Sequence, residues 1–211
     1  MLFLKLILVM SIVFSYIAYA DFSQKDPTDM VKELSDGVLN QLVIHRADFE
    51  AHPSKAVVFA EEYILPYVDT YKMSRYVMGR KWKQASKQQQ TDFVDAFTKT
   101  ILNSYASSLI KLQIEEIAIV KTTSKRKGRA SVETEVTQSS GEKTKVVYRL
   151  FQNKKDKKWF IYDFAVEGIS LLVNYRKSFS SEISKKGLDQ VITDMQNNLK
   201  TPEKEKSARG G

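Results

Sequence analysis

Apolar residues recur every three or four positions in the first part of the chain, which is the spacing of a helix with one buried face. The first such row predicts a helix over 28–44 and consists of Val31, Leu34, Val38 and Leu42. Prolines delimit the next helices, because proline is tolerated at a helix start but breaks the interior. The sequence therefore predicts two shorter helices over 53–65 and 67–78, the second closed by Gly79.

A longer amphipathic helix is predicted to begin at Ser86. Ser86 and Gln89 have the spacing of a capping box, in which each side chain bonds the backbone of the other residue. An apolar row with steps of four residues then extends over about six turns. Its members are Phe93, Phe97, Ile101, Tyr105 and Leu109. The row is the strongest periodic signal in the chain, and the helical part is predicted over about 27–112.

The apolar spacing changes after residue 113 to the alternation of β-strands. Val, Ile, Tyr and Phe dominate four segments, which are separated by polar clusters rich in Lys, Ser and Gly: 114–121, 130–137, 143–152 and 157–167. Short polar turns of this kind join antiparallel strands as hairpins. Within the fourth segment, residues 159–166 are apolar at almost every position except Asp163. Both of its faces are therefore expected to be covered, or one of them to meet a ligand.

A final helix is predicted over 182–199, with Gly187 as a weak point in its interior. Its apolar side consists of Leu188, Val191, Ile192, Met195 and Leu199. The charged residues 200–211 are predicted to be disordered. The whole pattern predicts an α+β fold, with a four-stranded antiparallel sheet packed against a mainly helical sub-lobe.

The first twenty residues have the pattern of a cleavable secretory signal. Lys5 provides a positive charge, an apolar run covers 6–17, and Ala18-Tyr19-Ala20 supplies the small residues for cleavage after Ala20. A membrane anchor is the alternative, although a spanning helix needs about twenty apolar residues. We expect an exported, soluble chain with one domain over 21–199.

Composition limits the possible chemistry. The chain has no cysteine, which excludes disulfides, thiol nucleophiles and zinc–thiolate sites. Its net charge is +8, and a basic surface can meet anionic lipid, acidic protein or nucleic acid. Export makes nucleic acid the least expected of these. Two basic runs, 121–129 and 154–158, fall at predicted hairpin turns; they either keep the loops soluble or face an anionic membrane or an acidic partner.

Catalytic and metal-binding patterns are weak. His45 and His52 stand near Pro53 without a nucleophile or an orienting acid that would suggest a triad. No ligand spacing typical of zinc or calcium occurs, so no metal or cofactor is expected. Asp163 is the one acid in a strongly apolar strand, and it either acts as a base with a raised pKa, points outward, or pairs with a basic neighbour.

Two segments carry a resemblance to a known family, namely YILPYVDTYKMSRYVMGRKWKQASKQQQTDFVDAF and WFIYDFAVEGISLLVNYRKSF. They resemble the MlaC family, also called toluene-tolerance or auxiliary organic-solvent-transport proteins. The matching positions include Leu65-Pro66 with Asp69, Met73-Ser74-Arg75, Gly79 with Trp82, Glu167-Gly168-Ile169-Ser170 and Asn174-Tyr175-Arg176 with Phe179. The resemblance covers essentially the whole chain after the signal.

The resemblance implies a curved, nuclear-transport-factor-2-like sheet and a periplasmic phospholipid carrier. Such a carrier shuttles lipid between an outer-membrane lipoprotein–porin complex and an inner-membrane lipid transporter complex, and thereby maintains outer-membrane lipid asymmetry. The direction of transport, the headgroup and the number of lipids do not carry over. Two rival hypotheses remain: an adaptor that docks on membrane complexes without carrying lipid, and an enzyme that uses Asp163 in a pocket.

A carrier must surround acyl chains with side-chain hydrocarbon, because exposing about thirty methylenes to water costs on the order of 20 kcal/mol. The apolar fourth strand and the long helical row are the candidates for such a lining. We predict that it comprises Phe97, Ile101, Tyr105, Val147, Phe151, Trp159, Ile161, Phe164, Val166, Ile169, Val173 and Tyr175. A phase error of one residue along a strand would exchange the two faces. Arg176 either faces the lipid phosphate or pairs with an acid such as Asp69.

Overall fold

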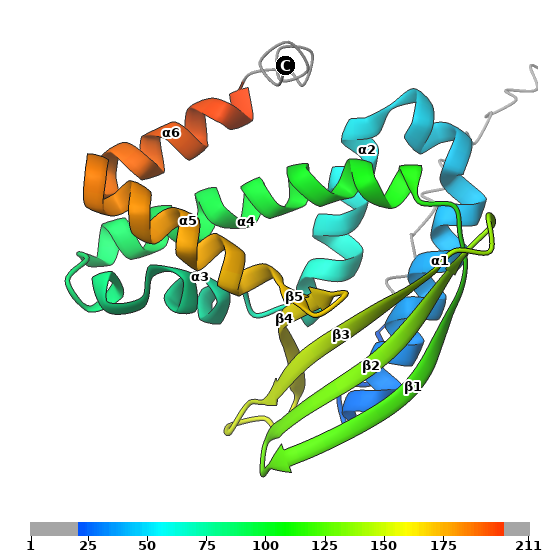
Figure 1. Cartoon of the computed structure of the whole chain (residues 1–211). Helices are drawn as coiled ribbons and strands as arrows, with labels where there is room; N and C mark the ends of the chain where they lie inside the picture. Colours follow the sequence, from blue (N-terminus) through cyan, green and yellow to red (C-terminus); the bar gives the residue numbers. More distant parts are fainter. Residues whose placement is uncertain (1–20, 201–211) are drawn as a thin grey trace, which may run out of the picture.

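The computed structural model describes residues 21–200. The predicted signal with its cleavage site after Ala20, and the predicted tail from residue 201 on, lie outside the described residues. Figure 1 shows a helical lobe beside a twisted antiparallel sheet, with α1 along one face of the sheet. The α+β fold class is therefore confirmed.

The sheet has five strands in the order β1-β2-β3-β4-β5, so the prediction of four strands was wrong by one short strand. The strands are β1 (Ile114–Arg126), β2 (Arg129–Gln138), β3 (Lys143–Gln152), β4 (Trp159–Val166) and β5 (Ile169–Ser170). The two residues of β5 pair with the end of β4 after a turn in which Glu167 and Gly168 both have positive φ. A strand of two residues shows no alternation, so the periodic pattern could not predict it.

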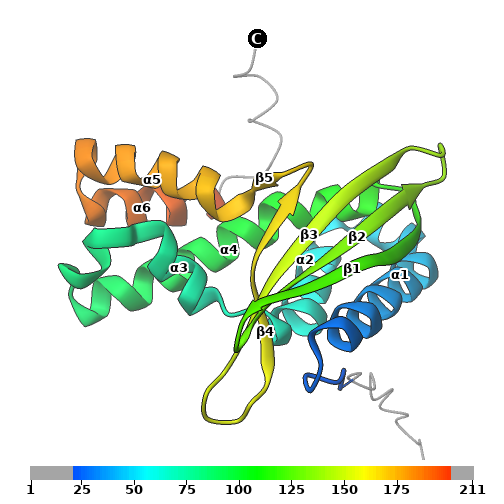
Figure 2. The same ribbon diagram turned by 60° about the horizontal axis from the view of Figure 1, so that its bottom comes forward.

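Helix α1 (Pro27–Ala51) is longer than its apolar row and lies against the sheet (Figure 2). Asp26 caps it, since its carboxylate accepts from the Thr28 and Asp29 amides at 2.7 and 3.2 Å. The predicted helix over 53–65 is α-helical only in α2 (Pro53–Phe59). It continues as a π-helical segment, Ala60–Ile64, and a 3₁₀ turn, Leu65–Tyr67. Pro66 explains the change, because it lacks an amide hydrogen and its ring displaces the carbonyl four residues earlier.

Helix α3 (Thr70–Met78) starts three residues later than predicted, where the Asp69 carboxylate accepts from the Lys72 amide at 2.7 Å. A 3₁₀ segment, Gly79–Lys83, leads to α4 (Lys87–Lys111). The predicted capping box is confirmed, with Gln89 N donating to Ser86 Oγ at 3.1 Å and Ser86 N to Gln89 Oε1 at 2.9 Å.

The apolar row of α4 leaves the interior as it proceeds along the helix. Phe93 and Phe97 are fully buried, whereas Tyr105 is 37% exposed. A step of four residues turns about 400°, so the row drifts by about 40° per step around the helix. Toward the end of α4 the interior positions are therefore Leu102, Ala106 and Ile110.

The single C-terminal helix predicted over 182–199 was wrong. The structure has α5 (Leu171–Lys186) and α6 (Leu188–Lys200), which are separated by Gly187 at φ +83°. Ser170 caps α5, its hydroxyl accepting from Val173 N at 3.2 Å. The first eleven residues of α5 were missed because no regular apolar row was recognised between the fourth strand and Glu182.

Two hydrophobic clusters hold the fold together. One lies between the sheet, α1 and the α2 region and includes Met30, Val132 and Leu150. The other joins α3, α4, α5 and α6 around Phe93 and Phe97. Val68 packs against both clusters. Within residues 21–200, none of the helices has the length and apolar character that crossing a bilayer requires.

Candidate functional site

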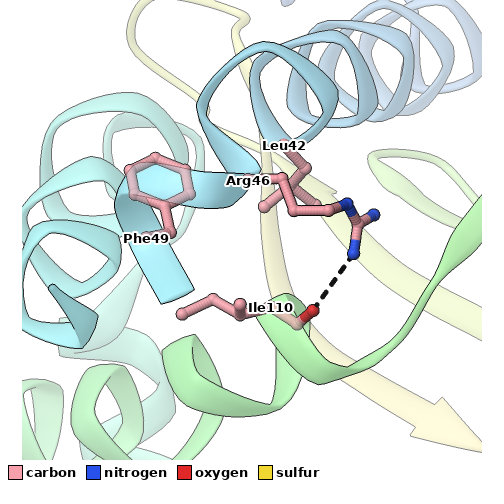
Figure 3. Close-up of a pocket in the computed structure, with 4 residues that line it drawn as sticks. All are labelled: Leu42, Arg46, Phe49 and Ile110. Atoms are coloured by element: carbon pink, nitrogen blue, oxygen red, sulfur yellow. Dashed lines mark hydrogen bonds between the residues drawn. The ribbon is translucent and has the colours of Figure 1, made fainter. Parts of the chain in front are cut away.

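Two hollows border α1, and neither fits two acyl chains. The first lies between α1 and the end of α4 (Figure 3), where it is lined by Leu42, Arg46, Phe49 and Ile110. Arg46 Nη1 donates to the Ile110 carbonyl at 3.4 Å across its rim. This hollow is too narrow to admit a water molecule, and lipid-sized ligands need close to 1,000 Å³.

The second hollow is an open groove of about 420 Å³ between α1 and β1. Its walls carry Lys32, Asp36, Glu115 and Glu116 beside Leu39 and residues 117–119. Desolvating these charges against hydrocarbon would be costly. The groove therefore lacks the apolar lining that an acyl chain requires.

A third region has the apolar character that these two hollows lack. Where the β4–β5 turn meets α4 and the start of α5, partly exposed apolar side chains gather. We call this cluster the apolar seam, and it comprises Ile101, Tyr105, Phe164, Val166, Ile169 and Tyr175. The Tyr105 and Phe164 rings meet edge to face at 5.9 Å between centroids, and Tyr105 shares a hydrogen bond with Tyr175. Val166 and Ile169 remain 40% and 62% exposed, and exposed apolar patches on soluble proteins commonly mark binding grooves.

The seam brings together six of the twelve residues predicted to line a pocket, and a bulge in β4 sets the face of Phe164 and Val166. In the pairing with β3, Arg149 stands opposite Asp163 and Leu150 opposite Ile161, so Tyr162 is the extra residue. Since paired residues share a face, Ile161 and Phe164 both lie on the face that α1 covers. Val166 follows on that face, toward the seam.

The other six predicted lining residues lie elsewhere. Val147 and Phe151 are on the opposite face of the sheet, since they alternate with Tyr148 and Leu150. Trp159 and Ile161 are buried in the cluster beneath α1, and Phe97 is buried among the helices. Val173 is 53% exposed and lies about 200° around α5 from Tyr175. For the β4 residues, the hairpin signal could not show the face, because it depends on the bulge.

The predicted headgroup residue Arg176 packs beside α3. Its guanidinium stands 5.0 Å from the Tyr76 ring, and a Cβ at Gly79 would approach its Nη2 to 3.0 Å. Gly79 also has φ +56°, a conformation that glycine adopts without strain. The alternative partner, Asp69, caps α3 instead, and no ion pair to Arg176 is found within residues 21–200.

Asp163 occupies a structural position. It is 3% exposed. Its Oδ2 accepts from Arg149 Nη1 and, at 2.7 Å, from Ser170 Oγ, while its Oδ1 accepts from the Leu172 amide at 3.1 Å. These bonds attach the start of α5 to β3 and β4. The sequence left open a pairing with a basic neighbour, and the structure identifies that neighbour as Arg149 on the adjacent strand.

Tyr105 is the seam residue whose ionisation reports its surroundings. Burial raises its pKa to about 12, and Tyr175 adds to the shift. The folded state thus favours the neutral phenol, and this contribution to stability is complete below pH 10 and lost as the pH rises through about 12. The tyrosinate absorbance of the wild type and of Tyr105→Phe is measured as the pH is raised, and the difference between them belongs to Tyr105. We expect this difference to have its midpoint near pH 12. A midpoint near 10 in folded protein would contradict the burial of this hydroxyl.

No group of three or more His, Asp or Glu side chains within residues 21–200 is arranged to hold a metal ion.

The comparisons with known proteins agree with one another. The family model described as MlaC protein matches residues 32–197. The intermembrane phospholipid transport system binding protein MlaC of Haemophilus influenzae is 22% identical over 184 residues, which are 85% of each chain.

A solved structure supports the same fold. The phospholipid-binding protein from Ralstonia solanacearum, determined in complex with a phospholipid, matches with a TM-score of 0.73 at 24% identity. The match covers 83% of this chain and 99% of that chain. The arrangement of sheet and helices is therefore one that a solved protein also adopts.

Proposed function

This chain belongs to the MlaC protein family, and we propose that it is a carrier that binds a phospholipid and moves it between two membranes. The observation that carries the proposal is the apolar seam, where Tyr105, Val166 and Ile169 remain partly exposed on a folded chain. The names of its relatives support it: one is a binding protein of an intermembrane phospholipid transport system, and another holds a phospholipid in its solved structure.

We place the acyl chains at the seam, between α4 and the end of β4. The hollows beside α1 are too small or too polar for acyl chains, and lipid enters in this proposal where the seam opens. Opening separates the Tyr105 ring from Phe164 and breaks its hydrogen bond to Tyr175. Losing such a ring contact costs about 1 kcal/mol, which is small beside the roughly 20 kcal/mol gained by removing two acyl chains from water.

The remaining parts of the proposal follow the family. The chain acts in the periplasm after cleavage behind Ala20. It exchanges lipid with an outer-membrane lipoprotein–porin complex and an inner-membrane lipid transporter complex, and thereby maintains lipid asymmetry. It works without catalysis, since the carboxylate of Asp163 is occupied by three donors that hold α5 in place.

Mass spectrometry of an organic extract tests the proposal directly. We expect protein purified from its native compartment to contain stoichiometric phospholipid, and emptied protein to take up lipid from vesicles. Protein that is empty and also fails to accept lipid would exclude the carrier. That result would favour the adaptor, for which the small volume of the hollows beside α1 is the supporting observation.

A pair of matched substitutions locates the lipid. Ile169→Asp places a carboxylate in the seam, and we expect at least about a tenfold loss of bound lipid. An unpaired charge against hydrocarbon costs more than the roughly 1.4 kcal/mol that corresponds to this factor. The control is Val173→Asp. Val173 is about as exposed as Ile169, but it lies on the side of α5 opposite Tyr175 and the seam. This variant should retain lipid. Equal lipid contents in the two variants would place the acyl chains elsewhere.

A further inference from the structure

The positive charge of this protein is concentrated at one end of its sheet. Residues 124–129, which are the β1–β2 turn with the adjoining strand ends, and the β3–β4 turn, 153–158, together hold eight Lys and Arg residues and one Asp, a net charge of +7. From residue 21 on, the whole chain has thirty-two Lys and Arg against twenty-five Asp and Glu, which is also +7. The rest of the chain is therefore neutral in sum. We call these two turns the basic end.

The basic end is a single surface in space. Antiparallel order places both turns at the same end of the sheet, and Figures 1 and 2 show them side by side, projecting away from α5 and α6. The opposite end of the sheet has mixed charge, with Glu115, Glu116, Glu142 and Glu167 beside Lys143 and Lys145. The sheet thus has a charge gradient along its strands, which orients the molecule in an external field.

The charges of the basic end are not neutralised within the fold. Its eight cationic side chains are all exposed, and no ion pair within residues 21–200 involves any of them. Arg129 lies 5.7 and 5.2 Å from the Phe151 and Tyr162 rings, and Lys72 Nζ is 3.7 Å from the Phe151 ring. Burial lowers the pKa of Lys72 and the nearby Arg129 lowers it further. Positive charge therefore continues from the turns to Arg129 and Lys72 beside the Phe151 ring, and Asp69 is an acid close enough to raise the pKa of Lys72 in part.

We propose that the basic end binds the surface of an anionic phospholipid bilayer. Six of its eight cations are lysines, which act as point charges and need no shaped partner. The two turns contain no apolar side chain, unlike the core of a protein interface. Clusters of four to eight basic residues bind anionic lipid surfaces, each residue raising the affinity on the order of fivefold.

Docking by this surface leaves the seam clear of the membrane. Val166 lies at the end of β4 opposite the β3–β4 turn, about 23 Å away at 3.3 Å per residue. The docked chain is thus held close to the bilayer while its seam faces a partner. Membrane binding and lipid content are therefore separate properties, and this inference goes beyond the proposed carriage of lipid.

Vesicle sedimentation tests the proposal. We expect the full chain to sediment with vesicles of phosphatidylcholine mixed with phosphatidylglycerol, but not with vesicles of phosphatidylcholine alone. Binding should weaken steeply with salt, since the Debye length is about 10 Å at 0.1 M. Replacing Lys154, Lys155, Lys157 and Lys158 together by Gln should reduce affinity by at least about tenfold.

The matched control removes the same charge from the helical lobe. Lys81, Lys83, Lys87 and Lys177 are exposed, and their replacement by Gln should leave binding nearly unchanged. No binding to the anionic vesicles, or equal losses in both variants, would overturn the proposal and indicate an acidic protein partner or a solubility role. Both variants should retain bound phospholipid. If the wild type bound the anionic vesicles but contained no phospholipid, only the carrier proposal would fail.

Discussion

Replacing Asp163 by alanine is expected to lower the free energy of unfolding by about 3 kcal/mol. The change leaves the buried amide of Leu172 and the hydroxyl of Ser170 without their acceptor. Each unsatisfied buried donor costs about 1–3 kcal/mol. Arg149 adds less, because its side chain is 37% exposed and regains water. Urea denaturation followed by circular dichroism measures the loss.

Two controls distinguish this role from others. Asp95→Ala removes an exposed acid that pairs with Lys99, and it should cost less than about 1 kcal/mol. Asp163→Asn keeps an acceptor for Leu172 and should give an intermediate loss. If Asp163→Ala were as stable as the wild type, Asp163 would not be the group that attaches α5 to the sheet.

Replacing Phe97 by alanine should cost about 3–5 kcal/mol. Phe97 is fully buried, and its ring packs against those of Phe93, Tyr175 and Phe179 at 5.7, 5.2 and 5.8 Å. Removal leaves a cavity where α4 meets α5, and the surrounding rings can fill it only in part. The midpoint of urea unfolding should fall while the slope of the transition is kept.

The same variant tests whether Phe97 lines the lipid site, as its helical row predicts. Its burial among the helices indicates a core role instead, so the phospholipid content of folded Phe97→Ala protein should match the wild type. Phe97→Leu is the control, and it should cost clearly less because it keeps most of the volume. A loss of lipid with unchanged stability would reverse this assignment and place Phe97 in the pocket.

Sequence patterns that span only a few residues predicted the corresponding helices and strands well. Ser86 and Gln89 form the predicted capping box, and polar turns separate the four long strands close to the predicted positions. Pro66 and Gly187 marked real discontinuities, but the change to π and 3₁₀ geometry and the break between α5 and α6 depend on packing. The family was also recognisable from two segments, as the match over 32–197 confirms.

The sequence by itself determined the helix-then-strand order, the family and the concentration of charge in two turns, because each depends on residue type and local spacing. Only the tertiary structure decided which apolar residues form the core and which form the seam. The bulge at Tyr162 sets the faces of β4, and the drift of the α4 row carries Tyr105 to the surface while Phe97 stays buried. Both results depend on contacts between residues far apart in the chain, which periodicity along the chain does not encode.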